Sequence, residues 1–248
     1  MHAQAFFIFL NFVFMHHYCH CAVAPVRKEP SDRSEQITQL LFGESIDLLE
    51  KQAKWSLIRG EDGYEGWIDN KQYHSGAEEF TNYVVSEREF VHHLHGHPIH
   101  LPHGSKLNIT HPAVQQALPW QIESLANVCK LYLNTPYLWG GKSIYGIDCS
   151  GLMQQTFKVH GLLLPRDAWQ QAELGETIHL PAEAQCGDLA FFDNAEGKII
   201  HVGMLLSPTE IIHASGWVRI DAFDHQGIFN RNLKHYSHKL RIIKRIRA

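Results

Sequence analysis

Short apolar runs separated by turn residues occupy the chain from about residue 18 to residue 73. The runs are CAVAPVR, TQLLFGESIDLLEK, KWSLIRG and YEGWIDN, and the breaks between them are Pro30-Ser31-Asp32, Gly43-Glu44 and Glu61-Asp62-Gly63. Short strands at close spacing, with turn residues between them, are typical of a small barrel or sandwich. The pattern therefore predicts a small all-β domain over residues 18–75.

After Trp120 the pattern changes to helical spacing. A first helix that ends at Pro136 is predicted from the spacing of Ile122, Leu125, Val128 and Tyr132. A second helix is expected to begin near Cys149, and the apolar runs that follow it are GDLAFFD, KIIHVGMLL, EIIHAS, WVRID and KLRIIKRI. Helices followed by a run of strands joined by short turns predict an α+β domain, with helices packed on an antiparallel sheet, over residues 119–248.

The segment 76–118 is either a connector or a second, degenerate β module. Its stretch VHHLHGHPIHLPHGS has six histidines between His92 and His103, a composition that is able to ligate zinc or nickel. No carboxylate or cysteine in it fixes a ligand set, so we interpret the stretch as a polar connector that ends in a strand.

Residues 1–17 form an apolar N-terminal segment whose core runs from Ala5 to Met15. That length suits a signal peptide and is too short to span a bilayer. However, no lysine or arginine precedes the core, and Pro25 follows the A-x-A site at residues 22–24. The compartment therefore stays open: the cell envelope or periplasm if residues 1–24 act as a signal, and the cytoplasm otherwise.

Composition narrows the class of protein. Of the 248 residues, 44% are hydrophobic and 19% are charged, as in a globular protein. The net charge of -4 lacks the basic excess of a nucleic-acid binder, so no nucleic-acid partner is expected, and no obligate protein partner is evident. The basic C-terminus alternates with Ile and Leu, which predicts a closing strand with a charged outer face.

One of the five cysteines, Cys149, is the candidate nucleophile. It lies between Asp148 and Ser150 at the expected start of a helix, where exposed backbone N–H groups favour a thiolate. By contrast, Cys129 falls on an apolar helix face and reads as a structural cysteine. The spacings fit neither a disulfide framework nor a zinc site, so no metal and no cofactor are expected.

Two histidines are candidate partners of this thiol. His201 and His213 lie twelve positions apart on successive predicted strands, so they are able to stand side by side in one sheet. His201 would then take the thiol proton while His213 orients the ring of His201. A single mid-strand histidine is usually a satisfied core residue, but the joint occurrence with Cys149 favours the catalytic interpretation.

Six short motifs occur along the chain in an order that resembles a known protein family. They are Y-x-W-G-G, D-C-S-G-L, L-P-R-D, G-D-L-x-F-F, H-V-G-M and H-A-S-G, between residues 137 and 216. Residues 120–248 resemble the NlpC-type family of bacterial cysteine peptidases, which have a papain-like fold and cleave peptidoglycan stem peptides. The resemblance implies that Cys149 is the nucleophile, His201 the general base and His213 the orienting third residue. It also implies that Tyr137 lines the oxyanion side, opposite the backbone N–H of Cys149.

The N-terminal region is similar to the bacterial SH3-like domain of cell-wall enzymes. It shows V-R-x-x-P-S, a Leu-x-x-Gly-Glu turn, and then Trp55 and Gly66-Trp67-Ile68. A subset of the family that carries this domain acts as γ-D-glutamyl-L-diamino acid endopeptidases, and two marks of that subset are present, Asp148 and Tyr64. The segment 76–118 would then be a connector or a second SH3-like module.

The resemblance implies further substrate-binding residues, which are Ser150, Arg166 and Asp167 besides Asp148 and Tyr64. Asp148 and Tyr64 are expected to bind the free α-amine of an N-terminal L-Ala. Two alternatives stay open: Asp148 caps its helix or pairs with Arg166, and Arg166 braces a loop. Some relatives have Ser where this chain has Ala168, so one polar contact to substrate is made elsewhere or is absent.

The function expected from these residues is a cysteine endopeptidase that hydrolyses the bond between γ-D-Glu and a diamino acid in stem peptides or muropeptides. An amidase or acyltransferase on the same scaffold is the first alternative. A non-catalytic wall-binding protein is the second, although it would normally have lost one of Cys149, His201 and His213.

Overall fold

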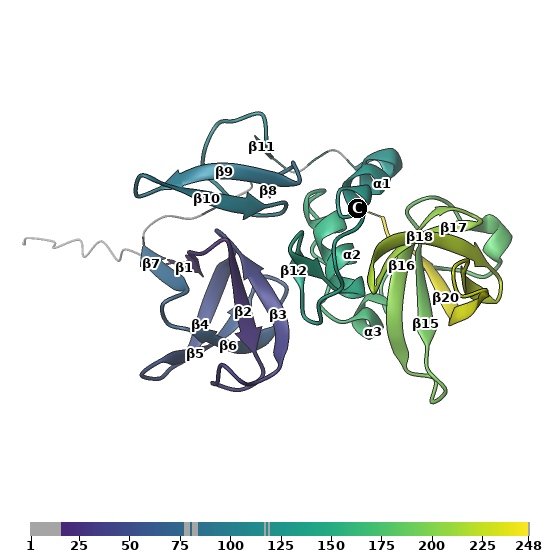
Figure 1. Cartoon of the computed structure of the whole chain (residues 1–248), viewed down its shortest axis with the longest axis horizontal. Coiled ribbons are helices and arrows are strands. Elements are labelled where there is room, and N and C mark those ends of the chain that lie inside the picture. Colours follow the sequence, from purple (N-terminus) through teal and green to yellow (C-terminus); the bar gives the residue numbers. More distant parts are fainter. Residues whose placement is uncertain (1–15, 77–79, 81–83, 117, 119, 248) are drawn as a thin grey trace, which may run out of the picture.

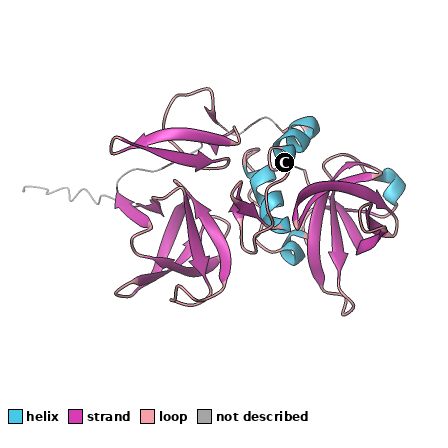
Figure 2. Cartoon of the chain, in the orientation of Figure 1, coloured by secondary structure: helices cyan, strands magenta, loops and turns pink. Residues whose placement is uncertain are grey.

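The computed structural model describes residues 16–76, 80, 84–116, 118 and 120–247. The apolar segment at residues 1–15 lies outside these residues, so the signal-peptide hypothesis is not addressed. Strands predominate, and most of the short helices lie in the middle of the molecule between two β-rich bodies, with one further helical turn at the right-hand edge (Figure 1, Figure 2). None of the helices within the described residues has the length and apolar character needed to cross a bilayer.

The N-terminal body is a seven-stranded antiparallel sheet in the order β3-β2-β6-β5-β4-β1-β7. Its strands are β1 (His16–Cys19), β2 (Val23–Arg27), β3 (Gln36–Leu41), β4 (Ser45–Lys51), β5 (Trp55–Gly60), β6 (Glu65–Asp69) and β7 (Tyr73–Gly76). The four apolar runs of the sequence supply β2 to β6, so the predicted all-β body is present. Alternate residues of these strands, such as Ala24 and Val26, fill its core.

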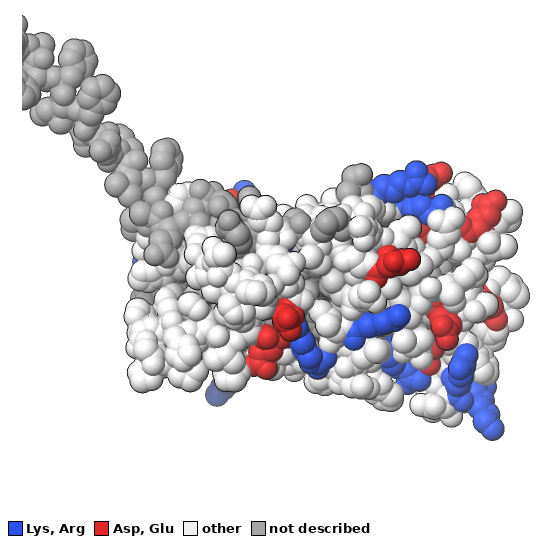
Figure 3. All heavy atoms as spheres, turned by 90° about the horizontal axis from the view of Figure 1, so that it is seen from above, with Lys and Arg blue, Asp and Glu red and all other residues white. Residues whose placement is uncertain are grey.

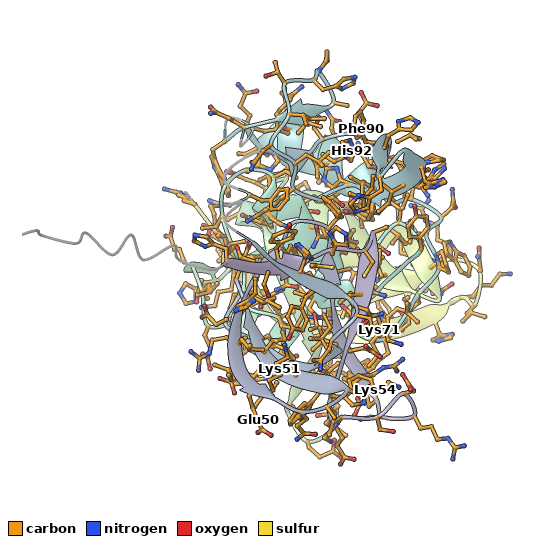
Figure 4. All side chains as sticks on the ribbon, turned by 90° about the vertical axis from the view of Figure 1, so that its left-hand side faces the viewer. Glu50, Lys51, Lys54, Lys71, Phe90 and His92 are labelled. Carbon is orange, nitrogen blue, oxygen red and sulfur yellow. The ribbon has the colours of Figure 1, made fainter. Side chains whose placement is uncertain are left out.

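The segment after β7 forms two small pairs of strands, in which β8 (Val84–Val85) pairs with β11 (Val114–Gln115), and β9 (Glu89–Leu94) pairs with β10 (His97–Pro102). Phe42, Val85 and Leu101 form part of a separate buried cluster here. The histidine-rich stretch makes the β9–β10 hairpin, and Phe90 and His92 mark it at one end of the molecule (Figure 4). Glu50, Lys51, Lys54 and Lys71 lie on the N-terminal body in the same view.

The C-terminal body has three α-helices and a second large sheet. The helices are α1 (Ile122–Lys130), α2 (Cys149–Lys158) and α3 (Ala168–Gln171), with a 3-10 turn η1 (Pro181–Glu183). The short strands β12 (Lys142–Ser143) and β13 (Gly146–Ile147) precede α2. The large sheet has β14 (Glu176–Ile178), β15 (Leu189–Asp193), β16 (Ile199–Ser207), β17 (Glu210–Ser215), β18 (Trp217–Asp224), β19 (Gly227–Asn230) and β20 (His235–Arg245).

This sheet closes on itself. Its order is β14-β20-β15-β16-β17-β18-β19, and β19 also pairs with β20, so the strands β15 to β20 form a ring. The predicted closing strand at the C-terminus is β20. One buried cluster lies between the helices and the barrel wall, and another lies inside the barrel. The domain thus has helices on an antiparallel sheet, as predicted, but it is richer in strands than the α+β description suggests.

A buried ionic cluster holds the two bodies together. The Glu44 carboxylate lies 2.5 Å from Lys158 Nζ and 3.4 Å from Lys142 Nζ, and all three side chains are buried. The two lysines belong to α2 and β12, whereas Glu44 follows β3. Removing one partner of a buried ion pair leaves an unpaired charge and is strongly destabilising. This cluster therefore holds the N-terminal body against β12 and the last turn of α2.

Candidate active site

The first turn of α2 is built around Asp148. Its Oδ1 accepts a hydrogen bond from the Gly151 N–H at 2.8 Å, which caps the helix. Its Oδ2 accepts from the Gly140 N–H at 2.8 Å, and the guanidinium of Arg166 binds both oxygens. Gly151 has no Cβ, and a Cβ there would lie 2.3 Å from the Gly141 carbonyl oxygen. The W-G-G and D-C-S-G motifs are therefore two halves of one packed turn.

Cys149 is the first residue of α2 and its side chain is buried at the wall of a cleft. Its thiol lies against the backbone N–H groups of Val202 and Ser150. Burial and the neighbouring Asp148 raise the pKa of the thiol to about 12, while the two amides and Arg166 oppose this rise. At neutral pH the resting thiol is therefore uncharged, so a base must take its proton before it attacks. The helix N-terminus alone does not supply the thiolate that the sequence suggested.

A chain of hydrogen bonds runs from His201 through His213 to Asp221. His201 is on β16 directly before Val202, and its Nε2 lies 2.8 Å from His213 Nδ1 on β17. His213 Nε2 in turn lies 3.1 Å from Asp221 Oδ2 on β18. The predicted pairing of His201 with His213 is thus present. Burial lowers the pKa of His201 well below its usual value, which keeps the resting ring neutral and able to accept a proton.

His238 on β20 completes a group of three imidazoles whose ligand atoms lie within 4.8 Å of one another. Its ring stacks on that of His201, with centroids 4.1 Å apart and planes 23° apart. A metal ion binds in the plane of each imidazole ring, so two stacked rings direct their lone pairs along nearly parallel lines and not at one point. The geometry suits ring packing better than a shared ion. Within the described residues, the histidine-rich hairpin does not form such a group.

The cleft beside Cys149 has a volume of about 520 Å³ and is lined from both bodies. Tyr64 and Glu35 come from the N-terminal body, and Asp167, Trp139 and the strand start at residues 198–200 come from the C-terminal body. The hydroxyl of Tyr64 lies 3.4 Å from both carboxylate oxygens of Asp167. Burial and Asp167 raise the pKa of Tyr64 to about 12, so this phenol stays protonated. The cleft wall therefore presents a carboxylate and a hydroxyl side by side.

Two family models match parts of the chain. The NlpC/P60 family model matches residues 134–237, and the model of the bacterial dipeptidyl-peptidase SH3 domain matches residues 26–72. Residues 134–237 are an NlpC/P60 domain. The N-terminal body is accordingly the SH3-like domain that the sequence predicted, and the predicted family is confirmed.

Two relatives cover most of the chain. Both are named gamma-D-glutamyl-L-lysine dipeptidyl-peptidase; one is from Bacillus cereus and the other from Bacillus subtilis. Each is 28% identical and covers 71% of this chain, which spans 66% of the first relative and 71% of the second. A solved structure of an NlpC/P60 family protein from Bacillus cereus covers 93% of this chain and 99% of its own, with a TM-score of 0.79. At 20% identity that likeness shows the fold. These matches agree with the predicted enzyme class, a cysteine peptidase of the NlpC type.

The NlpC/P60 domain brings most of the predicted site residues together. Tyr137, Asp148, Ser150, Arg166 and Asp167 all line the same cleft as Cys149 and Tyr64. Ser150 and Arg166 are joined by a 2.8 Å hydrogen bond, and both face Asp148. Both oxygens of Asp148 are therefore engaged within the protein, the arrangement that the sequence offered as the alternative to amine binding.

Some residues of the site were missed by sequence reasoning. Glu35, which accepts a hydrogen bond from Trp139 Nε1 at 2.8 Å, lies in a turn with no motif of its own. Asp221 and Arg219 had a usable signal, because opposite charges two positions apart on an apolar strand share one face of it. The stacked His238 had none, because β20 meets β16 only through the closed ring of strands.

Proposed function

We propose that the chain hydrolyses the amide bond between the γ-carbonyl of D-Glu and a diamino acid in peptidoglycan stem peptides that have a free N-terminal L-Ala. The observation that carries the proposal is the position of Cys149, at the start of α2 and in a cleft that Tyr64 and Asp167 close at one end. Both relatives are named γ-D-glutamyl-L-lysine dipeptidyl-peptidase, and these names support the same bond.

In the proposed reaction His201 accepts the thiol proton of Cys149 as Sγ attacks the γ-carbonyl carbon. Because His201 Nε2 is engaged with His213, its Nδ1 is the atom left for this proton. The oxyanion then receives hydrogen bonds from the Cys149 N–H and from Tyr137. Burial and the nearby Cys149 raise the pKa of Tyr137, so its hydroxyl stays a donor.

The tetrahedral intermediate collapses when the C–N bond breaks and His201 returns the proton to the departing amine. This leaves a thioester between Cys149 and the γ-carbonyl. Water, activated by the same histidine, then attacks the thioester and releases L-Ala-D-Glu together with the free thiol. Each proton that one group releases in these steps is accepted by another group, so water is the only reactant needed besides the peptide.

We assign recognition of the free amine to Asp167 and Tyr64 and the support of the first turn to Asp148. The 3.4 Å separations between the Tyr64 hydroxyl and Asp167 are long for a hydrogen bond, so the carboxylate retains acceptor capacity. Arg166, directly before Asp167, forms its ion pair with Asp148 and interacts with Asp167 only as a neighbouring charge. An ammonium group between these two side chains would satisfy the carboxylate.

Three finer statements belong to this proposal. The fold is papain-like, with helix-borne Cys149 packed against the strands that carry His201 and His213. The domain boundaries are residues 18–75, 76–118 and 119–248. The substrate is a released stem peptide or muropeptide, because the SH3-like body contributes Tyr64 to the end of the cleft where a sugar-linked L-Ala would continue.

On the face shown in Figure 3, lysine and arginine alternate with aspartate and glutamate and form no single-sign stripe.

The test is mass spectrometry of the products from L-Ala-γ-D-Glu-diaminopimelate and from its lysine analogue, with wild type and Cys149→Ala. The proposal expects L-Ala-D-Glu and the free diamino acid from wild type, and no turnover from the variant. An acyltransferase would instead give a new amide or ester when an amine or alcohol is added. A non-catalytic wall-binding protein would bind the peptide and leave it intact.

A further inference from the structure

Asp221 lies at the far end of the hydrogen-bond chain and does not line the cleft. It is buried on β18, where its Oδ2 faces His213 Nε2 at 3.1 Å. Arg219, two positions earlier on the same strand, donates from Nη2 to Asp221 Oδ1 at 2.8 Å, and its Nε lies 2.7 Å from Oδ2. We propose that Asp221, held by Arg219, is a positioning residue that fixes the tautomers of both histidines and so keeps His201 Nδ1 unprotonated beside Cys149. The inference rests on the proposed thiol mechanism.

The argument follows the protons along the chain. A carboxylate only accepts hydrogen bonds, so the Asp221–His213 contact requires a proton on His213 Nε2. A neutral imidazole has one N–H, so His213 Nδ1 is then an acceptor. The 2.8 Å contact between His213 Nδ1 and His201 Nε2 therefore requires the proton of His201 on Nε2. His201 Nδ1 is left with a lone pair, as a base for Cys149 needs.

The surroundings of Asp221 keep it ionised. Burial by itself would raise the pKa of this carboxyl group, but the hydrogen bonds from His213 and Arg219 outweigh burial and lower the pKa. The guanidinium of Arg219 lies 4.7 Å from the centre of the Trp217 ring, which braces it from β18 itself. The charged or titratable groups that face Asp221 are His213 on β17, Arg219 on β18 and His238 on β20. An acceptor-only group is thus maintained at this end of the chain.

Without this device the two histidines have a second, inactive arrangement. If His213 carried its proton on Nδ1, it would donate to His201 Nε2. His201 would then carry its own proton on Nδ1 and would no longer accept the thiol proton there. The two rings share one hydrogen bond in either arrangement, so the additional bond from His213 Nε2 to Asp221 decides between them.

Asp221→Asn is the sharpest perturbation because it has the same shape and loses only the charge. Arg219 makes its hydrogen bond to Asp221 from Nη2, whereas its Nε lies close to Oδ2 without the geometry of a hydrogen bond. Because Nη2 needs an acceptor, the amide oxygen turns to it and the NH₂ group faces His213 Nε2. That orientation enforces the inactive tautomers. The same replacement in the serine-protease triad lowers kcat about 10⁴-fold through a wrong tautomer. We expect a fall in kcat of at least about 10²-fold here, because Asp221 acts through one more ring.

The double variant Arg219→Met/Asp221→Asn separates this account from a simple loss of structure. Without the guanidinium the amide is free to turn its oxygen to His213, so kcat should recover about tenfold relative to Asp221→Asn alone. The KM should change less than about threefold in both variants, since neither residue lines the cleft. Asp224→Asn, at the end of the same strand and bonded to Tyr236, is the matched control and should keep wild-type kcat.

Two readouts need no substrate and so keep the inference separate from the proposed function. The first is the pH profile of Cys149 alkylation by iodoacetamide, which should shift to higher pH in Asp221→Asn because His201 no longer accepts the proton. The second is ring ¹⁵N NMR of the wild-type protein, with His201 and His213 assigned by their loss in His→Gln variants. The inference expects both rings to carry their proton on Nε2.

The inference is overturned if His213 in wild type carries its proton on Nδ1, or if Asp221→Asn stays within about threefold of wild-type kcat. It is also overturned if the double variant is no more active than Asp221→Asn. If wild type fails to cut the peptides while the NMR result and the alkylation shift appear, the proposed function is wrong and the tautomer assignment stands.

Discussion

Removal of the substrate's N-terminal amine should lower kcat/KM about ten- to a hundredfold. The perturbation is a propionyl-γ-D-Glu-diamino acid peptide, in which L-Ala lacks only its ammonium group. In the structure Asp167 and the Tyr64 hydroxyl face one another across the end of the cleft at 3.4 Å. A hydrogen bond to a charged group is worth roughly 1.5–3 kcal/mol. At about 1.4 kcal/mol for each factor of ten, that range gives the predicted loss.

The assay measures kcat/KM for four pairings, wild type and Asp167→Asn with the ammonium and the propionyl peptide. Asparagine is also a good N-cap residue, so α3 keeps its start at Ala168. In Asp167→Asn the preference for the ammonium peptide should fall to within about threefold of unity. An N-methyl-L-Ala peptide, which keeps the charge and adds bulk, should behave like the ammonium peptide, whereas N-acetyl-L-Ala should behave like the propionyl one.

Equal rates for the ammonium and propionyl peptides in wild type would refute amine recognition. An open groove that accepts stem peptides still attached to sugar would then be the better account. A preference that survives in Asp167→Asn would refute the assignment of the subsite and direct attention to Glu35 and Asp148, the other carboxylates that line the cleft.

Three further predictions concern the remaining parts of the account. His201→Ala should abolish turnover as fully as Cys149→Ala, while His213→Ala should leave more, since water is able to replace an orienting group in part; steady-state kinetics with a more severe His213→Ala would reverse the two roles. Iodoacetamide at neutral pH, with the modified sites identified by peptide mass spectrometry, should label Cys149 and no other buried cysteine. Cys21 is the competing site, because the hydrogen bond from Cys19 lowers the pKa of its thiol. Equal labelling of another fully buried cysteine would contradict this prediction. Burial raises the pKa of the Glu44 carboxyl group, but its two lysine partners outweigh burial and hold that pKa at about 2. The ionised carboxylate therefore contributes on the order of 3 kcal/mol to the free energy of unfolding above pH 4.5, and this contribution is lost toward pH 2. The unfolding free energies of wild type and Glu44→Gln, measured by chemical denaturation, should converge on acidification, and a constant difference would contradict the linkage.

The sequence predicted those parts of the site in which the interacting residues lie on one element or on two successive strands. The start of α2 at Cys149 follows from the capping residue Asp148 and the apolar spacing behind it. The pairing of His201 with His213 follows from the two-strand hairpin, in which His213 lies opposite Gly203 and diagonally across from His201 on the same face. In both cases the residues that interact are few positions apart, so the pattern alone fixes their geometry.

Contacts between distant segments could not be predicted in the same way. The engagement of Asp148 by Arg166 and the approach of Tyr64 to Asp167, 103 positions away, depend on how the bodies pack. The closure of the barrel depends on β20 pairing with both β15 and β19, which no strand pattern specifies. The raised pKa of Cys149 has the same origin, because burial against β16 outweighs the local helix effect.

The central claim, that Cys149 attacks a γ-glutamyl carbonyl, is tested most directly by trapping the acyl-enzyme. An activated γ-thioester of L-Ala-D-Glu makes acylation faster than hydrolysis, so the intermediate should accumulate. After an acid quench, peptide mass spectrometry should find the L-Ala-D-Glu acyl group on Cys149 alone, and none on the Cys149→Ala variant. An acyl group on another residue, or hydrolysis of the thioester by Cys149→Ala at the wild-type rate, would contradict the account.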